Sequence, residues 1–185
     1  MTNLLVKENQ RSINSKFMLV FLIGYMGSGK STAGKKLAKL LGYGFADLDN
    51  HIEKRSGRRI ADIFAIEGEE EFRRLERLYL EKLCNLEDHV IATGGGTPCF
   101  GRNIELMKRN GKVVYLKMTA AALAKRLSQK DNSRPLLKNT GNKSLENFIE
   151  EHLAQREQFY GQADVVVNGV SLDLKNLAQQ LSSTQ

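Results

Sequence analysis

Gly24-Tyr25-Met26-Gly27-Ser28-Gly29-Lys30-Ser31 matches the phosphate-binding pattern G-x-x-x-x-G-K-[S/T] at every fixed position. The three glycines allow a tight backbone turn whose N–H groups point inward, and the helix expected after the loop adds positive potential. In this pattern Lys30 reaches the terminal phosphates of a bound nucleotide, and the Ser31 hydroxyl faces magnesium. The stretch therefore predicts a nucleoside triphosphate site between a strand and a helix.

The sequence on either side of this loop has the patterns of those two elements. Residues 17–23 are continuously apolar, which is typical of a strand buried on both faces of a parallel sheet. After the loop, Leu37, Leu40 and Leu41 recur at helical spacing, and Gly42 is a stop signal. Strand and helix patterns alternate to the end of the chain, which predicts an α/β fold with a parallel sheet of about five strands and helices on both faces. Further strands are expected at 42–49, 89–92, 112–116 and 163–167, and further helices at 60–66, 69–83, 120–127, 144–160 and 174–181.

The length of 185 residues suits one domain, with residues 17–185 forming the domain and residues 1–16 a flexible N-terminal tail. The tail lacks the apolar core of a signal peptide, and the apolar run at 17–23 is far shorter than the ~20 residues that cross a bilayer. Cys84 and Cys99 share no ligand-like spacing with each other or with a histidine, so neither a zinc site nor a disulfide framework is indicated. We expect a cytoplasmic protein, and we expect it to be a monomer.

The net charge of +7 is compatible with several kinds of partner. Nucleic acid, an anionic membrane surface and small anionic substrates all attract a basic protein, and a merely basic surface is the simplest explanation. Aromatic and basic residues do not interleave in the pattern that stacks on nucleic-acid bases. We therefore expect small-molecule substrates, with neither nucleic acid nor a membrane as partner.

The strand expected at 42–49 ends in two carboxylates, those of Asp47 and Asp49. Asp47 and Asp49 are two positions apart, so in an extended chain their side chains point the same way, toward the crevice that the carboxyl ends of parallel strands face. One carboxylate is expected to hold magnesium directly or through water, and the other to accept a proton from a substrate hydroxyl. The simpler alternative is that Asp49 caps a helix beginning at Asn50.

Two arginines are expected to face inward from helices. The apolar stripe of the helix at 69–83 includes Glu76 and has Arg73 at its edge. These residues are three positions apart and can pair while leaving guanidinium donors for a second anion; an ordinary ion pair on a solvated helix is the alternative. In the helix at 144–160, Arg156 lies within the inward face, where a charge needs an anionic partner. That partner is either a substrate carboxylate or a protein Asp or Glu.

Two loops have compositions that suit substrate binding. Gly94, Gly95 and Gly96 form a turn at the end of a strand, and its free N–H groups suit a bound substrate, although a plain turn explains them equally well. Residues 128–142 are polar and turn-rich, and a long loop of this kind is often a mobile lid. Arg134 in this loop is either an ordinary surface residue or an arginine that swings onto the transferring phosphate.

Six motifs occur in a fixed order along the chain. They are the phosphate loop extended through Thr32, Asp47-Leu48-Asp49, Ile60-Ala61-Asp62-Ile63-Phe64, Glu71-Phe72-Arg73-Arg74-Leu75-Glu76, Gly94-Gly95-Gly96 and Arg134-Pro135-Leu136-Leu137. In this order and at these spacings the sequence resembles a shikimate kinase from residue 17 to residue 167. The resemblance implies a fold like that of nucleoside monophosphate kinases and transfer of the ATP γ-phosphate to the 3-hydroxyl of shikimate, a step toward chorismate and the aromatic amino acids.

The resemblance also implies a role for each matching residue. Asp49 contacts the shikimate hydroxyls and acts as the base, Ser31 and Asp47 belong to the Mg²⁺ shell, and Lys30 and Arg134 complete the catalytic set. Arg73 and Arg156 hold the shikimate carboxylate, which Gly94, Gly95 and Gly96 help to enclose. The residues implied to bind ATP are Gly27, Ser28, Gly29, Lys30, Ser31, Thr32, the adenine-stacking Arg126, and Arg134.

The sequence departs from the family pattern in two places, and it leaves other kinases open. The tail at 1–16 precedes the usual start of the family, and residues 167–171 lack the proline found near the adenine in some members. A kinase of the same architecture acting on gluconate, which also carries a carboxylate and hydroxyls, is the main alternative. A GTP-dependent switch is disfavoured because Asn142-Lys143-Ser144-Leu145 has leucine where the guanine-reading motif has aspartate.

Overall fold

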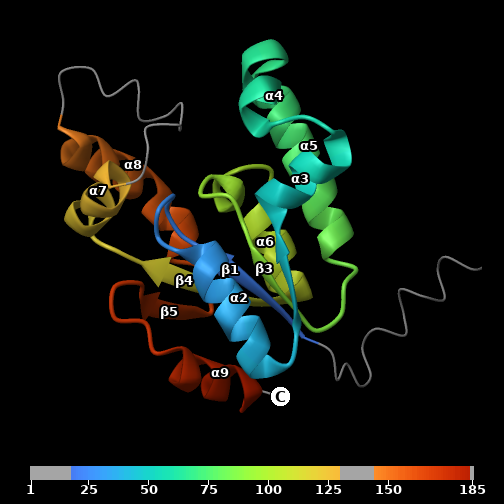
Figure 1. Cartoon of the computed structure of the whole chain (residues 1–185), viewed down its shortest axis with the longest axis vertical. Coiled ribbons are helices and arrows are strands. Elements are labelled where there is room, and N and C mark those ends of the chain that lie inside the picture. The colour runs from blue at the N-terminus through green and yellow to red at the C-terminus, as the bar shows by residue number, and fades with distance from the viewer. Residues whose placement is uncertain (1–17, 130–143, 184–185) are drawn as a thin grey trace, which may run out of the picture.

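A parallel five-stranded sheet forms the centre of the protein, as the sequence predicts (Figure 1). This computed structural model describes residues 18–129 and 144–183, so the expected tail and Arg134 lie outside the described residues. The strand order is β2-β3-β1-β4-β5, and every pairing is parallel. The strands are β1 (Leu19–Ile23), β2 (Gly44–Asp47), β3 (His89–Ala92), β4 (Gly111–Lys117) and β5 (Val165–Asn168).

Eight α-helices and one short 3-10 helix are found in the described part of the chain. None of these helices is long and apolar enough to cross a membrane. The α-helices are α2 (Lys30–Leu41), α3 (Leu48–Ser56), α4 (Ile60–Ile66), α5 (Gly68–Leu83), α6 (Asn103–Asn110), α7 (Ala120–Ser128), α8 (Leu145–Tyr160) and α9 (Leu174–Ser182), and the 3-10 helix is η1 (Thr97–Cys99).

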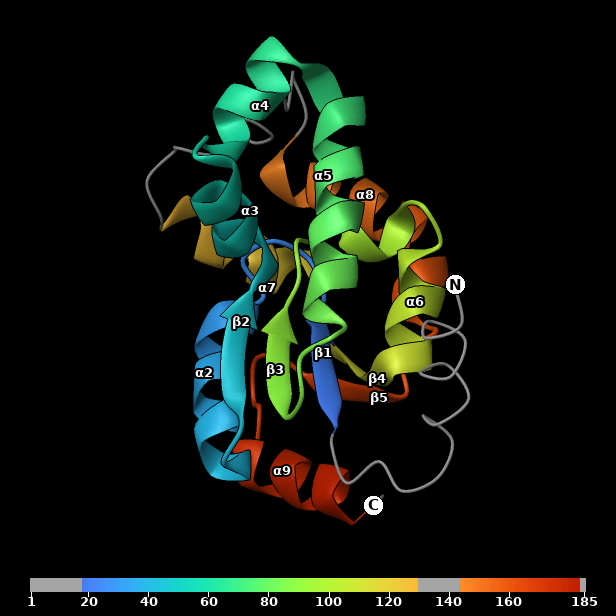
Figure 2. The ribbon, with the colours of Figure 1, turned by 90° about the vertical axis from the view of Figure 1, so that its right-hand side faces the viewer.

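The central strand β1 is buried on both faces, as its unbroken apolar sequence requires. Phe21 and its odd-numbered neighbours on β1 pack into one core with residues of α3, α5 and α6, while Val20 and Leu22 pack into a second core with α2 and α9. A third, smaller core joins Tyr25 of the phosphate loop to α7 and α8. In Figure 2 the arrowheads of β2 and β3 point toward the end of the sheet at which α3 lies. The carboxyl ends of the strands therefore open onto the segments that carry the motifs.

Three local features differ from the sequence expectations. Helix α6 was not expected, because it has only eight residues, and its first turn follows a residue in the left-handed conformation, Arg102 with φ 58°. The strand expected at 42–49 ends at Asp47, since a helix begins at Leu48. Helix α7 continues through Ser128, so it includes the first residue of the expected lid, most of which lies outside the described residues.

Candidate active site

The phosphate loop joins β1 to α2, and its glycines are required by space as well as by conformation. Gly24 has φ +140°, and a Cβ there would lie 2.8 Å from the backbone oxygen of Leu116 on β4. Gly27 has φ +82°, and a Cβ there would lie 2.9 Å from a methyl carbon of Leu127 on α7. The loop therefore keeps its shape by packing its main chain directly against two neighbouring elements.

Lys30 begins α2 and is 8% exposed. Its Nζ donates hydrogen bonds to the carbonyl oxygens of Gly24 at 2.7 Å and Tyr25 at 3.0 Å, so the amine lies within the turn of the loop. Ser28 is also buried and Gly29 has φ +93°, whereas Thr32 is exposed on the first turn of α2. All the predicted loop residues are thus part of one compact turn at a helix N-terminus, which is the geometry that favours phosphate.

Arg126 on α7 contacts the back of the phosphate loop. One terminal nitrogen, Nη1, donates to the carbonyl oxygen of Ser28, and the other, Nη2, donates to that of Gly169, each at 3.1 Å. Gly169 lies in the segment after β5, which the sequence analysis placed near the adenine. Arg126 therefore connects the phosphate loop to that segment.

Asp47 and Ser31 lie together, as the resemblance implies. The Ser31 hydroxyl donates to Oδ2 of Asp47 at 2.5 Å, and the other oxygen of Asp47 accepts from the backbone N–H of Asn50. Asp47 is thus the N-cap of α3, so the expectation that Asp49 caps this helix is wrong. A hydroxyl and a carboxylate at the edge of the phosphate loop form an oxygen donor set of the kind that Mg²⁺ accepts.

Asp49 reaches the site from a helix rather than from an extended chain. It occupies the first turn of α3, so the argument that Asp47 and Asp49 share one side of a strand is wrong in its geometry. The side chain nevertheless lies beside the glycine turn, since a Cβ on Gly94 would lie 3.0 Å from Oδ1 of Asp49. It is therefore helix α3, and not an extension of strand β2, that places the Asp49 side chain at this end of the sheet.

The glycine turn at 94–96 meets a different part of the site at each residue. A Cβ on Gly94 would lie within 3.2 Å of Thr97, Asp49 and Glu76, with Thr97 Oγ1 the nearest at 2.9 Å. On Gly95 it would lie 3.1 Å from the backbone nitrogen of Met26 in the phosphate loop. On Gly96 it would lie 2.8 Å from Nη2 of Arg73. Residues of the phosphate loop, α3 and α5 therefore all approach this turn, which a plain surface turn does not explain.

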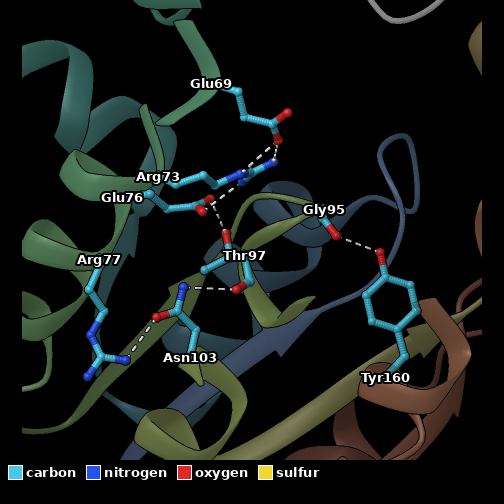
Figure 3. Close-up of polar contacts among 8 residues, drawn as sticks. All are labelled: Glu69, Arg73, Glu76, Arg77, Gly95, Thr97, Asn103 and Tyr160. Carbon is cyan, nitrogen blue, oxygen red and sulfur yellow. Dashed lines mark hydrogen bonds and ion pairs between the residues drawn. The ribbon is translucent and has the colours of Figure 1, made fainter. Parts of the chain in front are cut away.

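Arg73 on α5 is held by two acids and an aromatic ring. Its Nη1 donates to Oε2 of Glu76 at 2.7 Å, and its Nε and Nη2 both donate to Oε1 of Glu69 (Figure 3). The guanidinium carbon lies 3.9 Å from the ring centroid of Phe100. The side chain of Glu76 is 1% exposed, so the Arg73–Glu76 pair is not the solvated ion pair that the sequence left open.

A further chain of hydrogen bonds holds Glu76 itself. The Thr97 hydroxyl donates to Oε1 of Glu76 at 2.6 Å, and the Asn103 side chain donates to the Thr97 carbonyl oxygen at 2.9 Å. Arg77 in turn donates to Oδ1 of Asn103 at 3.1 Å (Figure 3). The sequence analysis missed Thr97 and Asn103 because their role depends on contacts among α5, η1 and α6, which no local pattern reports.

Arg156 on α8 has no acidic partner on the described part of the protein. None of the ion pairs among residues 18–129 and 144–183 includes it. Instead its guanidinium carbon lies 5.1 Å from the ring centroid of Tyr25 in the phosphate loop. Of the two kinds of partner that the sequence left open, a protein acid is therefore not found within ion-pair distance among the described residues.

The electrostatics of Cys99 indicate that the two arginines converge. Burial raises the pKa of the Cys99 thiol, and the positive charges of Arg156 and Arg73 oppose this effect. Both guanidiniums are therefore close enough to one thiol, at the end of η1, to act on its charge. Arg73 and Asp49 thus lie beside the glycine turn, and the charge of Arg156 acts on Cys99 just after it, a combination of charges that suits a small acid carrying hydroxyl groups.

Comparison with known proteins identifies a family and close relatives. The model of the shikimate kinase family matches residues 26–184. A shikimate kinase of Parabacteroides distasonis is 49% identical over 146 residues, which cover 79% of this chain and 84% of that protein.

Two crystal structures of shikimate kinases have the same fold. That of the Bacteroides thetaiotaomicron enzyme has a TM-score of 0.82 at 38% identity and covers 91% of this chain and 98% of its own. That of the Acinetobacter baumannii enzyme, in complex with shikimate, has a TM-score of 0.80 at 35% identity and covers 91% and 93%. A gluconokinase from Sinorhizobium meliloti is only 19% identical, with a TM-score of 0.53, so it shares the fold alone.

Proposed function

The chain belongs to the shikimate kinase family, and from this membership we propose how its own residues bind the two substrates and transfer the phosphoryl group. The family's reaction moves the γ-phosphoryl group of ATP to the 3-hydroxyl of shikimate, in the pathway to chorismate and the aromatic amino acids. The carboxylate is the only charged group of shikimate. The single observation that carries the proposal is that Arg156 lies beside the Tyr25 ring of the phosphate loop and forms an ion pair with no acid of the described protein.

In the proposed complex, Arg156 and Arg73 both donate to the shikimate carboxylate. Charge-assisted hydrogen bonds of this kind contribute about 1.5–3 kcal/mol each. Arg73 already has donors committed to Glu76 and Glu69, so it serves mainly as a fixed charge, while Arg156 has more of its donors to offer. Gly94, Gly95 and Gly96 enclose the acceptor because any side chain on them would occupy its space or displace its ligands.

Asp49 is the proposed general base. Its carboxylate accepts the proton of the 3-hydroxyl as the hydroxyl oxygen bonds to the γ-phosphorus, and the bond from that phosphorus to the bridging oxygen of ADP breaks. Lys30 stabilises the charge on the leaving side from within the phosphate loop. Arg134, which lies outside the described residues, is proposed to add a second positive charge there.

Ser31 and Asp47 are the residues proposed to hold Mg²⁺. No group of three or more His, Cys, Asp or Glu side chains suited to a metal occurs among the described residues, so the phosphates and water would complete the coordination. When bound, the ion neutralises charge on the β- and γ-phosphates. The oxygen pair already present, Ser31 Oγ and Asp47 Oδ2, fits this preference for hard oxygen ligands.

The remaining expectations stay proposals. Gly27, Ser28, Gly29 and Thr32 would contact the phosphates of ATP, and Arg126 would stack on the adenine from its position on α7. We further propose that the protein acts as a monomer in the cytoplasm and that neither nucleic acid nor a membrane is its partner.

A coupled assay of ADP release tests the choice of acceptor. We expect ADP release from ATP and Mg²⁺ to rise when shikimate is added, and not when gluconate is added at the same concentration. Removing Mg²⁺ with a chelator should abolish the shikimate-dependent rate. Turnover of gluconate but not of shikimate would contradict the proposal, and faster release of GDP from GTP than of ADP from ATP would contradict the assigned donor.

A further inference from the structure

We propose that Tyr160 is a positioning residue for the acceptor: its hydroxyl fixes Arg156 and the glycine turn relative to each other. The inference rests on the proposed role of Arg156 in binding the acceptor carboxylate. It assigns a function to a residue that lies outside all six of the sequence motifs. Its observations come from the end of α8 and the turn at 94–96.

The Tyr160 hydroxyl connects α8 to the glycine turn. Tyr160 is the last residue of α8 and is 0% exposed. Its hydroxyl donates to the carbonyl oxygen of Gly95 at 2.6 Å (Figure 3). Because Gly95 packs against the backbone of Met26 on its other side, this hydrogen bond acts on the middle of the turn, where the turn is closest to the phosphate loop.

The same hydroxyl lies beside Arg156. Arg156 is four positions before Tyr160, one helical turn earlier, so both side chains lie on the same face of α8. The positive charge of Arg156 acts on the Tyr160 hydroxyl and opposes the rise in its pKa, so the two groups lie near each other. The neutral neighbours of Arg156 thus include the Tyr160 hydroxyl and the Tyr25 ring.

The Tyr160 hydroxyl must keep its proton to donate a hydrogen bond to Gly95. Burial raises the pKa of Tyr160, and the opposing effect of Arg156 is smaller. Since the ordinary pKa of tyrosine is about 10, the hydroxyl keeps its proton at neutral pH. Its proton is directed to Gly95 while its lone pairs remain available to Arg156, so a single oxygen atom can hold both.

A neutral partner suits the function better than a carboxylate does. An acid beside Arg156 would compete with the substrate carboxylate for the guanidinium, as Glu76 and Glu69 occupy donors of Arg73. Without any partner, the long arginine side chain would have to be ordered by the substrate, which costs conformational entropy. The tyrosine orders the guanidinium without neutralising its charge.

The test is the variant Tyr160→Phe, which removes one oxygen and keeps the ring. Tyr115→Phe is the matched control, because Tyr115 is 1% exposed, its ring stacks against that of Tyr160 at 4.9 Å, and its hydroxyl donates to Glu157 instead of to the turn. We expect Tyr160→Phe to raise the KM for shikimate about 5- to 20-fold, with kcat and the KM for ATP changed less than about threefold. Tyr115→Phe should leave all three constants near those of the wild type.

The position of Arg156 in this inference is tested with double variants. In the Arg156→Ala background, adding Tyr160→Phe should raise the KM for shikimate by far less than it does alone, because the residue it acts through is gone. If Arg156→Ala itself leaves this KM unchanged, the carboxylate role fails. If Arg156→Ala raises it while Tyr160→Phe does not, the carboxylate role stands and the positioning role of Tyr160 is overturned.

A measurement without turnover covers the case in which Tyr160→Phe is too unstable to assay. Saturating shikimate should raise the midpoint of thermal unfolding of the wild type and of Tyr115→Phe, since a ligand that binds only the folded state stabilises it. The increase should be clearly smaller in Tyr160→Phe at the same shikimate concentration, because its affinity for shikimate is expected to be lower. An equal increase in both phenylalanine variants would overturn the inference.

Discussion

The phosphate loop and the acceptor side of this site are built by different means. The loop is one continuous stretch, held by main-chain contacts and by Lys30, whose amine donates to two carbonyl oxygens of the same loop. The acceptor side is assembled from α3, α5, α8 and the glycine turn, and its charges are held by side chains. Within that side, Arg73 has two acidic partners and Arg156 has none among the described residues. Substitutions in the phosphate loop and substitutions on the acceptor side should therefore have different effects on the kinetics.

The largest effect is expected from Asp49→Asn, which removes the proposed base and keeps the shape of the side chain. We expect kcat to fall about 10²- to 10⁴-fold, with a much smaller change in the KM for shikimate. Asp62→Asn is the control, because Asp62 pairs with Arg59 on the exposed side of α4. Steady-state kinetics with both substrates measures the effect. An unchanged turnover would remove Asp49 from the chemistry and leave the acceptor side a binding surface only.

The next largest effect is expected from Arg156→Ala, which tests the arginine of the acceptor side that has no acidic partner among the described residues. We expect the KM for shikimate to rise about 10- to 100-fold, because a charge-assisted hydrogen bond to the carboxylate is lost. The KM for ATP should stay near the wild-type value. Arg74→Ala is the control, since Arg74 pairs with Glu71 on the outer side of α5. Equal losses for both substrates would refute the separation between the phosphate and acceptor sides.

A smaller effect is expected from Glu76→Gln, which tests the arginine that does have acids. The amide can still accept from Thr97, but its N–H₂ group faces the donors of Arg73. We expect a loss of about 1–3 kcal/mol in the free energy of unfolding and a rise of about 5- to 10-fold in the KM for shikimate. Glu71→Gln should change neither quantity measurably, because its pair with Arg74 is exposed to solvent. The comparison fails if the two variants behave alike.

The smallest effect is expected from the titration of His152, which lies one turn before Arg156 on α8 and hydrogen-bonds to Tyr25. Burial lowers the pKa of His152 below 6.5, and the charge of Arg156 lowers it further. Below pH 6.5 the unfolded chain thus binds the proton more readily than the folded protein does, so stability falls as the pH falls through that range. In His152→Gln the midpoint of thermal unfolding should lose about 1–2 °C less than that of the wild type between about pH 7 and about pH 5. Equal losses would contradict this.

How far the sequence predicted the site follows from the same contrast. The phosphate loop and the strand and helix beside it were predicted in detail, because a short motif and an apolar run report local geometry. The inward position of Arg156 was also predicted, since helical periodicity alone determines it. The helix that carries Asp49 began earlier than expected, because the Asp47 cap is recognised only once Asn50 is seen to donate to it.

Other parts of the site depend on contacts between distant segments and gave no local signal. Tyr160, Thr97 and Asn103 are a buried tyrosine, threonine and asparagine in unremarkable sequence. Their hydrogen bonds join residues that are 65, 21 and 6 positions apart in the sequence. The bond with the largest separation forms only once the fold has brought α8 next to the glycine turn. Reading such residues from a sequence requires the tertiary fold first.

The contact of Gly95 with the backbone of the phosphate loop has a thermodynamic consequence. The turn proposed to enclose shikimate and the loop proposed to enclose ATP are therefore close together, because a Cβ on Gly95 would lie 3.1 Å from the backbone nitrogen of Met26. A substrate that moved one of these segments would also move the other. Linkage then requires reciprocity: by whatever factor ATP alters the dissociation constant of shikimate, shikimate alters that of ATP by the same factor.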